Sequence, residues 1–381
     1  MSIHRCGHSL HGYQSVTQAT KSGVSALYTP PYPPFVHGLW TTNAAVATVC
    51  HRAGMATRYE LAPATRMLWR DSDVVQFESG GHGVVVEGLS ARSARSLTNP
   101  AADPPDPGCI SALARLAELG YLWPSDFDDH ARHAAPNPHL AAELAALSVR
   151  RGIEAAQTLH ARRQAFVTVQ GTGRVGPAVG AALAASGVGR VSFTTDTDVK
   201  AHHPLPGGVL PAERGQRLAV AARAAVRRAA PDAAVAARDA SQRPDLALLA
   251  VDEPVDDDHR DALHAHGTAH LLVALGPASA VVGPLVLPGL TSCLRCAGLH
   301  RRDRDEAWPR LAVQLTVGRR TGPSSEVAMA TMAAGLAAAQ VLAFLDGEES
   351  ACLGGTLELH PPDWRVRRRT WALHPSCGCC G

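Results

Sequence analysis

The sequence has almost no net charge. Its 36 lysines and arginines are offset by 34 aspartates and glutamates, which leaves +2 when histidine is neutral. A protein that binds the phosphate backbone of nucleic acid usually presents a strong positive field, and this balance provides none. The 19 histidines could add positive charge only in mild acid. Nucleic acid is therefore not expected as the main partner.

The sequence also lacks the segments that direct a chain to a membrane. We find no apolar run of the roughly 20 residues that span a bilayer, and the N-terminal stretch has no apolar core of a secretory signal. We therefore predict a cytoplasmic protein with no membrane partner.

Cysteine is too scarce for a disulfide scaffold, because the chain has nine cysteines in 381 residues. "TSCLRCAGLH" contains Cys293 and Cys296, and "HPSCGCCG" contains Cys377, Cys379 and Cys380. Two short cysteine pairs can close a tetrahedral thiolate site on Zn²⁺, and four thiolates leave no open position, so such a zinc is structural. The CxxC spacing favours Cys380 as the fourth ligand, and Cys379 is the tighter alternative.

The length and composition, with 46% hydrophobic and 18% charged residues, are typical of a globular protein of two domains. Residues 1–54 show no sustained apolar period, so we predict that they are disordered and dispensable for folding. A second interpretation is that the natural start lies near Met55 and that these residues are a mis-annotated extension.

Residues 55–135 are predicted to form a small winged-helix-like α+β module. "RMLWRDSDVVQFES" and "GVVVEG" are typical of two strands, and "ISALARLAELGYLW" is typical of an amphipathic helix. A sheet this small keeps an exposed edge that could accept an extended peptide as a further strand. The alanine-rich residues 136–164 predict a linker helix into the main domain.

In residues 165–381, the apolar strands "AFVTVQ", "RVSFTT", "DLALLAVD" and "AHLLVALG" alternate with helices. This order predicts an α/β fold with a Rossmann-like, doubly wound parallel sheet. The turn after the first strand contains Gly171, Gly173 and Gly176, and such a turn places backbone N–H groups beside a phosphate. By this pattern alone Asp196 would bind an NAD ribose, as in an oxidoreductase. A tight turn without a ligand is the other interpretation.

Together these motifs resemble the ThiF/MoeB-type E1-like activating enzymes, over residues 165–381. The resemblance rests on the glycine turn, "ASGVGRVSF", "GPLVLPGLTSCLRC", the long helix in "SSEVAMATMAAGLAAAQVLAFLDG" and the terminal cysteines. It implies ATP and Mg²⁺ rather than NAD, and a homodimer: a carboxylate of a peptide or small carrier protein attacks the α-phosphate, pyrophosphate leaves and an acyl-adenylate forms. NAD would leave both cysteine pairs unexplained.

The same resemblance implies roles for single residues. It assigns Gly171, Gly173 and Gly176 to the ATP phosphates and Asp252, at the end of "LALLAVD", to Mg²⁺. Asp252 could equally be a helix N-cap. Arg217 stands where the family carries a lysine on the α-phosphate, and arginine keeps that charge in a different geometry.

The chain departs from the family pattern in three places. The first ribose-binding aspartate of the family falls on Thr195, and Asp196 is one residue late, which in a strand points to the opposite face. "VKAHHPLPGG" lacks the usual Asn and Arg-Gln contacts to ATP; Lys200, His202 and His203 could supply a cation there, and a solvated loop is the preferred interpretation. Residues 297–330 contain no cysteine, so the usual thioester nucleophile is missing.

Two functions remain from the sequence. One is an enzyme that adenylates a carboxylate. The other is a catalytically lapsed E1-like scaffold that binds a precursor leader peptide for a partner modifying enzyme, because the module at 55–135 resembles the leader-binding winged helix of proteins from thiazole/oxazole-type ribosomal peptide clusters. An NAD-dependent oxidoreductase is the third and weakest hypothesis.

Overall fold

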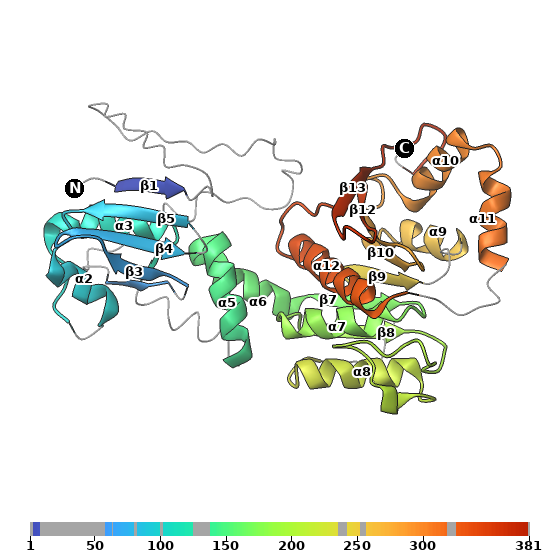
Figure 1. Ribbon diagram of the computed structural model, residues 1–381, viewed down its shortest axis with the longest axis horizontal. Helices are drawn as coiled ribbons and strands as arrows, with labels where there is room; N and C mark the ends of the chain where they lie inside the picture. The colour runs from blue at the N-terminus through green and yellow to red at the C-terminus, as the bar shows by residue number, and fades with distance from the viewer. Residues whose placement is uncertain are drawn as a thin grey trace. The chain divides into compact units, whose positions relative to one another are not determined.

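The computed structural model describes residues 3–7, 58–62, 64–79, 82–99, 102–124, 138–234, 242–251, 257–317 and 325–379. The chain divides into two compact units, which are residues 1–133 with 144–156, and residues 134–143 with 157–381. Each unit is described by itself (Figure 1).

The first unit contains an antiparallel sheet whose described strands run in the order β1-β5-β4-β3. Their bounds are Ile3–Gly7 for β1, Arg66–Trp69 for β3, Val74–Ser79 for β4 and His82–Glu87 for β5. Burial alternates along β4, because Val75 and Phe77 point into the core while their neighbours are half-buried. A second small sheet pairs β2 (Tyr59–Leu61) with β6 (Leu122–Pro124).

Among the described residues, α2 (Ala91–Thr98) and α3 (Ile110–Glu118) pack in the core with this sheet, and a 3₁₀ turn at Pro107–Cys109 precedes α3. Leu113 and Leu116 of α3 are fully buried against the valines of β4 and β5. Ser90 caps α2, since its hydroxyl accepts a hydrogen bond from the Ser93 N–H. The expected small α+β module is therefore present.

One strand of this sheet, β1, comes from residues 1–54, the segment that the sequence predicts to be disordered. β1 pairs with β5 in antiparallel register, with Ile3 opposite Val86 and Gly7 opposite His82. Periodicity in the sequence could not reveal it, because five residues are too few to show a pattern and the partner strand is far away in the chain. Residues 8–57 lie outside the described part of the chain, so the rest of that expectation stays a prediction.

The predicted single linker helix is two helices. α5 (Pro138–Arg151) ends where Gly152 adopts a positive φ of 55°, and α6 (Ala155–Gln164) begins after a short 3₁₀ turn at Gly152–Glu154. A left-handed residue at this place ends a helix, and glycine adopts that conformation without a steric cost.

In the second unit, the described strands form a seven-stranded mixed sheet in the order β13-β12-β11-β10-β9-β7-β8. The four strands from β10 to β8 are parallel, and β11, β12 and β13 are antiparallel. The predicted α/β fold is confirmed, and the antiparallel extension is an addition to it. The strand bounds are β7 Phe166–Gln170, β8 Arg190–Thr194, β9 Leu246–Val251, β10 His270–Leu275, β11 Ala280–Val286, β12 Gly355–Leu359 and β13 Val366–Thr370.

Helices cover both faces of this sheet. On one face α7 (Val175–Ala185) packs against α8 (Leu218–Ala229) and α12 (Val327–Leu345). Alternate residues of β9 show the two faces: Leu248 belongs to the core with α7 and α12, whereas Leu249 packs with Leu263 of α9 (Asp257–Ala265). The remaining helices are the 3₁₀ turn Pro211–Glu213, α10 (Leu294–Arg304) and α11 (Trp308–Val317).

α12 corrects the expectation that no apolar segment of membrane-spanning length exists. It has 19 residues with a mean hydropathy of 1.8, so it meets that test by length and composition. One side of the helix packs in the protein core, because its alanines are small enough to lie close to β11 and α7. The buried residues are Met329, Ala330, Ala333, Ala334, Ala337, Ala338 and Val341.

A buried ion pair joins α6 to the end of α12. The Arg162 side chain is 1% exposed, and its Nε and Nη2 donate to the two carboxylate oxygens of Asp346 at 2.7 and 2.6 Å. Its Nη1 donates to Glu143 and to the carbonyl of Ser186, at the end of α7. The guanidinium therefore ties α6 to the C-terminal ends of α7 and α12.

Candidate nucleotide site and metal centre

The glycine turn lies where the sheet changes its winding direction, between β7 and β9. Ligands of open α/β sheets bind at the carboxyl ends of strands at such a point. Gly171 has a φ of 103°, and a Cβ on it would lie 2.3 Å from the carbonyl oxygen of Ala250. A Cβ on Gly173 would lie 2.9 Å from the same carbonyl, and one on Gly176 would lie 3.0 Å from Val169. These glycines are required because the turn packs against β9.

The N–H groups of the three glycines all donate to protein carbonyls. Gly171 donates to Thr194 at 3.1 Å, Gly173 to Ala250 at 2.9 Å and Gly176 to the carbonyl of Gly173 at 3.2 Å. In this structure these N–H groups shape the turn, and the assignment of the three glycines to the ATP phosphates stays a prediction.

Other amides of the turn remain as donors for a phosphate. Within the described part of the chain, the N–H groups of Thr172 and Val175 donate to no protein acceptor. Val175 is the first residue of α7, whose N-terminus carries a partial positive charge. The N–H groups of Thr172 and Val175, which lie between the glycines, can therefore donate to a phosphate.

His203 holds this turn in place, which corrects the interpretation of "VKAHHPLPGG" as a solvated loop. The side chain is 1% exposed. Its Nδ1 accepts a hydrogen bond from the Lys200 N–H at 2.7 Å, so its Nε2 carries the proton and donates to the carbonyl of Thr172 at 3.0 Å. Burial, with the nearby charges of His202, Lys200 and Arg174, lowers the pKa of His203 to about 4. The imidazole is therefore neutral near pH 7.

Arg174 adds a fixed positive charge beside the turn. Arg174 is 6% exposed. Its guanidinium donates to the carbonyl of Ser325 at 3.0 Å and to the carbonyl of Pro204 at 2.6 Å. No local pattern in the sequence indicates this role, because the partners of Arg174 lie 30 and 151 residues away. Arg174 and His203 together attach the segment at 200–204 to the turn.

Arg217 and Asp196 are brought together at the carboxyl end of β8. The Arg217 Nη1 lies 3.4 Å from Asp196 Oδ1 and 3.7 Å from Asp198 Oδ1. All three side chains are exposed, so the pairs contribute about 0–1 kcal/mol each and leave the arginine able to move. Asp252 lies outside the described residues, so its assignment to Mg²⁺ stays a prediction.

Two polar atoms near this edge have no hydrogen-bond partner among the described residues. They are Gln170 Oε1, at the end of β7, and Thr195 Oγ1, just after β8. Thr195 is also the position that the family pattern reserves for a ribose-binding aspartate. A buried hydroxyl without a partner is costly, so this position is suited to a ligand hydroxyl or an ordered water.

Four cysteines form a second site. The Sγ atoms of Cys293, Cys296, Cys377 and Cys379 all lie within 4.8 Å of one another. Cys293 and Cys377 are 3.5 Å apart, and Cys296 and Cys379 are 3.4 Å apart. Four thiolates at about 2.3 Å from a tetrahedral Zn²⁺ would be separated by roughly 3.8 Å, so the geometry fits this ion. The fourth cysteine here is Cys379, and Cys380 lies outside the described residues.

The surroundings of these cysteines suit a cation. Burial raises the pKa of the Cys293, Cys377 and Cys379 thiols, so each favours the neutral form without an opposing charge. The His374 N–H donates to Cys296 Sγ at 3.4 Å, while its Nε2 lies 2.7 Å from an oxygen of Asp303. Such outer hydrogen bonds orient metal ligands. The site would join the start of α10 to the C-terminal segment.

Cys352 offers no nucleophile. It is fully buried, its Sγ donates to the carbonyl of Val282 at 3.4 Å, and burial raises the pKa of its thiol to about 12. This agrees with the expectation that it is a packing residue.

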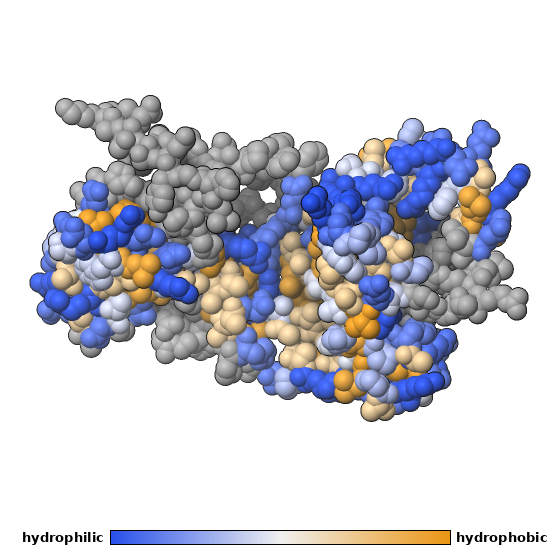
Figure 2. Space-filling model, in the orientation of Figure 1, coloured by the Kyte–Doolittle hydropathy of each residue, from blue (hydrophilic) through white to orange (hydrophobic). Residues whose placement is uncertain are grey.

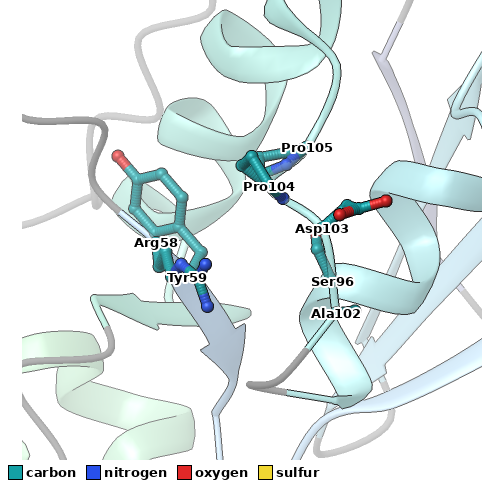
Figure 3. Close-up of a pocket in the computed structure, with 7 residues that line it drawn as sticks. All are labelled: Arg58, Tyr59, Ser96, Ala102, Asp103, Pro104 and Pro105. Carbon is teal, nitrogen blue, oxygen red and sulfur yellow. The ribbon is translucent and has the colours of Figure 1, made fainter.

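The first unit has a small hollow at Arg58 and Tyr59 (Figure 3). The two residues face a loop that contains Pro104 and Pro105, and Ser96, Ala102 and Asp103 complete the lining. Its volume is about 10 Å³, which is room for about one water molecule. This hollow is too small for a peptide side chain.

No protein-family model matches the chain, and no curated protein matches its sequence. Solved structures match its fold. Escherichia coli MccB with AMPCPP and MccA aligns with a TM-score of 0.63 and 16% identity, over 85% of this chain and 99% of that one. The microcin C7 biosynthetic enzyme MccB with N-formylated MccA aligns at 0.61 and 18%, over 85% and 99%. PaaA aligns at 0.53 and 17%, over 69% and 92%. The chain therefore has the E1-like α/β fold of MccB.

Proposed function

We propose that this chain is an E1-like, ThiF-type protein of a peptide-modification pathway, which uses ATP and Mg²⁺ to adenylate a carboxylate of a peptide or small carrier protein. The supporting observation is the glycine turn, which lies at the switch point of the sheet. The fold of the chain aligns over 99% of MccB, a protein solved with AMPCPP and MccA. In adenylation a carboxylate oxygen forms a bond to the α-phosphorus of ATP. The bond between the α-phosphorus and the oxygen that bridges to the β-phosphate breaks, and pyrophosphate leaves.

In this proposal the residues of the turn position the nucleotide. The amides of Thr172 and Val175 bind phosphate oxygens, and the buried charge of Arg174 favours anions beside them. Arg217, which is 65% exposed and weakly paired, can turn toward the α-phosphate as pyrophosphate leaves. Asp252 holds Mg²⁺, which would neutralise charge on the phosphates.

The proposal stops at the acyl-adenylate, with no thioester step. The sequence has no cysteine in residues 297–330, and Cys352 is buried with a raised thiol pKa. A partner enzyme or an external nucleophile would therefore take the activated carboxylate. The peptide itself is bound by the N-terminal module through strand addition.

A structural zinc and a homodimer belong to the same proposal. The zinc is bound by Cys293, Cys296, Cys377 and Cys379, and it contributes to folding. A second copy would cover apolar surface on α12, where Figure 2 shows apolar residues gathered. There a groove of about 390 Å³ is lined by Thr331, Met332, Gly335, Leu336, Leu359 and Val366. We place the protein in the cytoplasm.

The second candidate function is a scaffold that binds a precursor peptide without activating it. The observations that favour it are Thr195 at the ribose position and Asp196, whose side chain is 98% exposed and paired with Arg217. A solvated carboxylate of this kind is not held toward a ribose.

ATP–pyrophosphate exchange tests the choice, measured with and without the precursor peptide encoded beside the gene. The enzyme should exchange only with Mg²⁺, and both Asp252→Asn and Arg217→Ala should reduce the rate by about 10²-fold or more. Arg214→Ala, an exposed arginine on the same segment, is the matched control and should leave exchange unchanged.

Two results would reject adenylation. Tight peptide binding without exchange would identify the scaffold. Thermal stabilisation by NAD but not by ATP with Mg²⁺ would identify an oxidoreductase instead.

A further inference from the structure

Three arginines of the second unit gather around one indole, and we call them the arginine cluster. The guanidinium carbon of Arg301 lies 4.9 Å from the centroid of the Trp371 ring. The same carbons of Arg369, on β13, and Arg304, in the last turn of α10, lie 5.7 and 6.0 Å from that centroid. Trp371 is 3% exposed, and its Nε1 donates to Thr356 Oγ1 at 3.2 Å. The indole is therefore a fixed base on which the cations stack.

Positive charge exceeds negative charge in the arginine cluster. Arg369 is paired, because its Nε lies 2.8 Å from Glu358 Oε1. Within the part of the chain that the structure describes, the guanidiniums of Arg301 and Arg304 make no ion pair and no hydrogen bond. Burial lowers the pKa of Arg301, and the charges of the two neighbouring arginines act in the same direction, against that of Glu358. An added anion would therefore lower the electrostatic energy of the cluster.

Arg301 is held in place without an acceptor. It is half-buried, and its guanidinium carbon also lies 5.4 Å from the ring of Trp308, so two indoles hold the side chain. A guanidinium that stacks on aromatic rings keeps the N–H groups at its rim for hydrogen bonds in its own plane. Donors without an acceptor are unfavourable, and a carboxylate can accept two of them at once. The site is therefore prepared for a carboxylate.

Further positive charge continues along β13, which is the outermost strand in the order of the sheet. All five residues of β13 are exposed, and Figure 2 shows hydrophilic residues gathered over β13 and α10. Arg367 and Arg369 are two positions apart, so they share a face of the strand with a spacing of roughly 7 Å. Arg367 pairs with Asp363, and both are exposed, so another carboxylate can replace this partner. Alternate residues of an extended peptide have the same spacing.

The distribution of charge favours an acidic peptide over other anions. A single phosphate could reach the arginines at Trp371 but not Arg367 at the same time. A nucleic-acid backbone is continuously negative, and it would meet the exposed carboxylates of Asp303, Asp305 and Glu306 at the end of α10. A peptide with acidic residues at alternate positions can face the arginines and place neutral residues near these carboxylates.

We propose that the arginine cluster, together with Arg367, binds an extended acidic segment of a partner protein. Carboxylates at alternate positions of the segment accept hydrogen bonds from the guanidiniums of Arg301 and Arg304 and then reach the arginines of β13. Trp371 keeps the cluster in its binding geometry, which reduces the entropy lost on binding. This interaction uses neither the nucleotide site nor the N-terminal module, so it goes beyond the proposed function and does not depend on it.

The test measures the binding of a fluorescent decapeptide with alternating serine and glutamate to the full chain, by fluorescence anisotropy at low salt. The double variant Arg304→Gln with Arg369→Gln should bind at least about tenfold more weakly, because it loses two of the cations. Arg301 stays in place because it packs between two indoles. The matched control is Arg214→Gln with Arg227→Gln, which removes two exposed arginines elsewhere and should leave the affinity within about twofold.

Three further measurements define the interaction. Binding should weaken steeply as salt is added, since exposed charges are screened. A peptide with glutamine in place of every glutamate should not bind. The double variant should keep the zinc content and the unfolding midpoint of the native chain; if it does not fold, Arg304→Gln alone, at the exposed end of α10, should still weaken binding by about threefold.

Three results would overturn the proposal. Equal affinity of the double variant and its matched control would show that the peptide responds only to overall charge. Displacement of the peptide by inorganic phosphate at equal concentration would identify an isolated oxyanion site. Tighter binding of a DNA duplex than of the peptide, lost in the same double variant, would identify a nucleic-acid surface instead.

Discussion

The stability of the protein should fall steeply in mild acid because of His203. This imidazole is buried beside the glycine turn, accepts from the Lys200 N–H and donates to the carbonyl of Thr172. Protonation would destroy its acceptor and place a charge beside His202, Lys200 and Arg174, which also lower its pKa. Acid should therefore loosen the turn that is proposed to hold the nucleotide.

The pKa values set the magnitude and the direction of this effect. The pKa of His203 is about 4 in the folded protein, against 6.5 in the unfolded chain. The unfolded chain therefore binds more protons between these values, and stability is lost as the pH falls from 6.5 to 4. At 1.36 kcal/mol per pH unit, the free energy of unfolding should decrease by about 3 kcal/mol between pH 7 and pH 4.

Urea unfolding at half-unit pH steps measures this loss, with His203→Gln as the comparison. Glutamine can still donate to Thr172 but does not titrate, so the variant should lose about 3 kcal/mol less over the same range. His259→Asn, on the exposed side of α9, is the control and should keep the full loss. Identical pH dependence in the native chain and His203→Gln would show that His203 is not the buried neutral group described above.

Three further predictions concern the metal centre, the turn and the ion pair. Cys379→Ser should remove about one zinc per chain and lower the melting temperature, and metal analysis that finds no zinc in unchelated native protein would refute the site. Gly173→Ala should destabilise the protein by about 1–3 kcal/mol, whereas Gly298→Ala, in open space on a helix, should stabilise it by up to about 1 kcal/mol; equal effects in thermal unfolding would contradict the packing of the turn. Arg162→Met should cost about 3–5 kcal/mol of unfolding free energy because it leaves the buried Asp346 unpaired, and a loss below about 1 kcal/mol would contradict this.

Local patterns in the sequence were sufficient for much of the fold. Strands such as Leu246–Val251 are continuous apolar runs because both faces of a parallel sheet are covered by helices, so the alternation of strands and helices was visible directly. The cysteine clusters were visible for a similar reason, since metal ligands come from short turns whose spacing is local.

Long-range pairing could not be predicted in the same way. The pairing of Ile3–Gly7 with β5 depends on a partner far along the chain, and no local period signals it. His203 looked like part of a solvated loop because its burial arises from contacts with Thr172 and Lys200 across a folded turn. The two candidates for the fourth zinc ligand, Cys379 and Cys380, are adjacent, so spacing alone could not separate them. Gly378, with a φ of 66°, turns the chain so that the Cys379 thiol lies with the other three.

The glycine turn cannot by itself decide between an enzyme and a scaffold. Gly171 and Gly173 are required because a Cβ at either position would collide with the backbone of β9, whether or not a nucleotide is bound. A protein that had lost adenylation would therefore retain both glycines in order to fold. Groups that serve only the reaction are under no such constraint, and Arg217, exposed and weakly paired, is one that the fold does not need. Its replacement should leave stability almost unchanged, so a loss of pyrophosphate exchange in Arg217→Ala would report chemistry rather than folding.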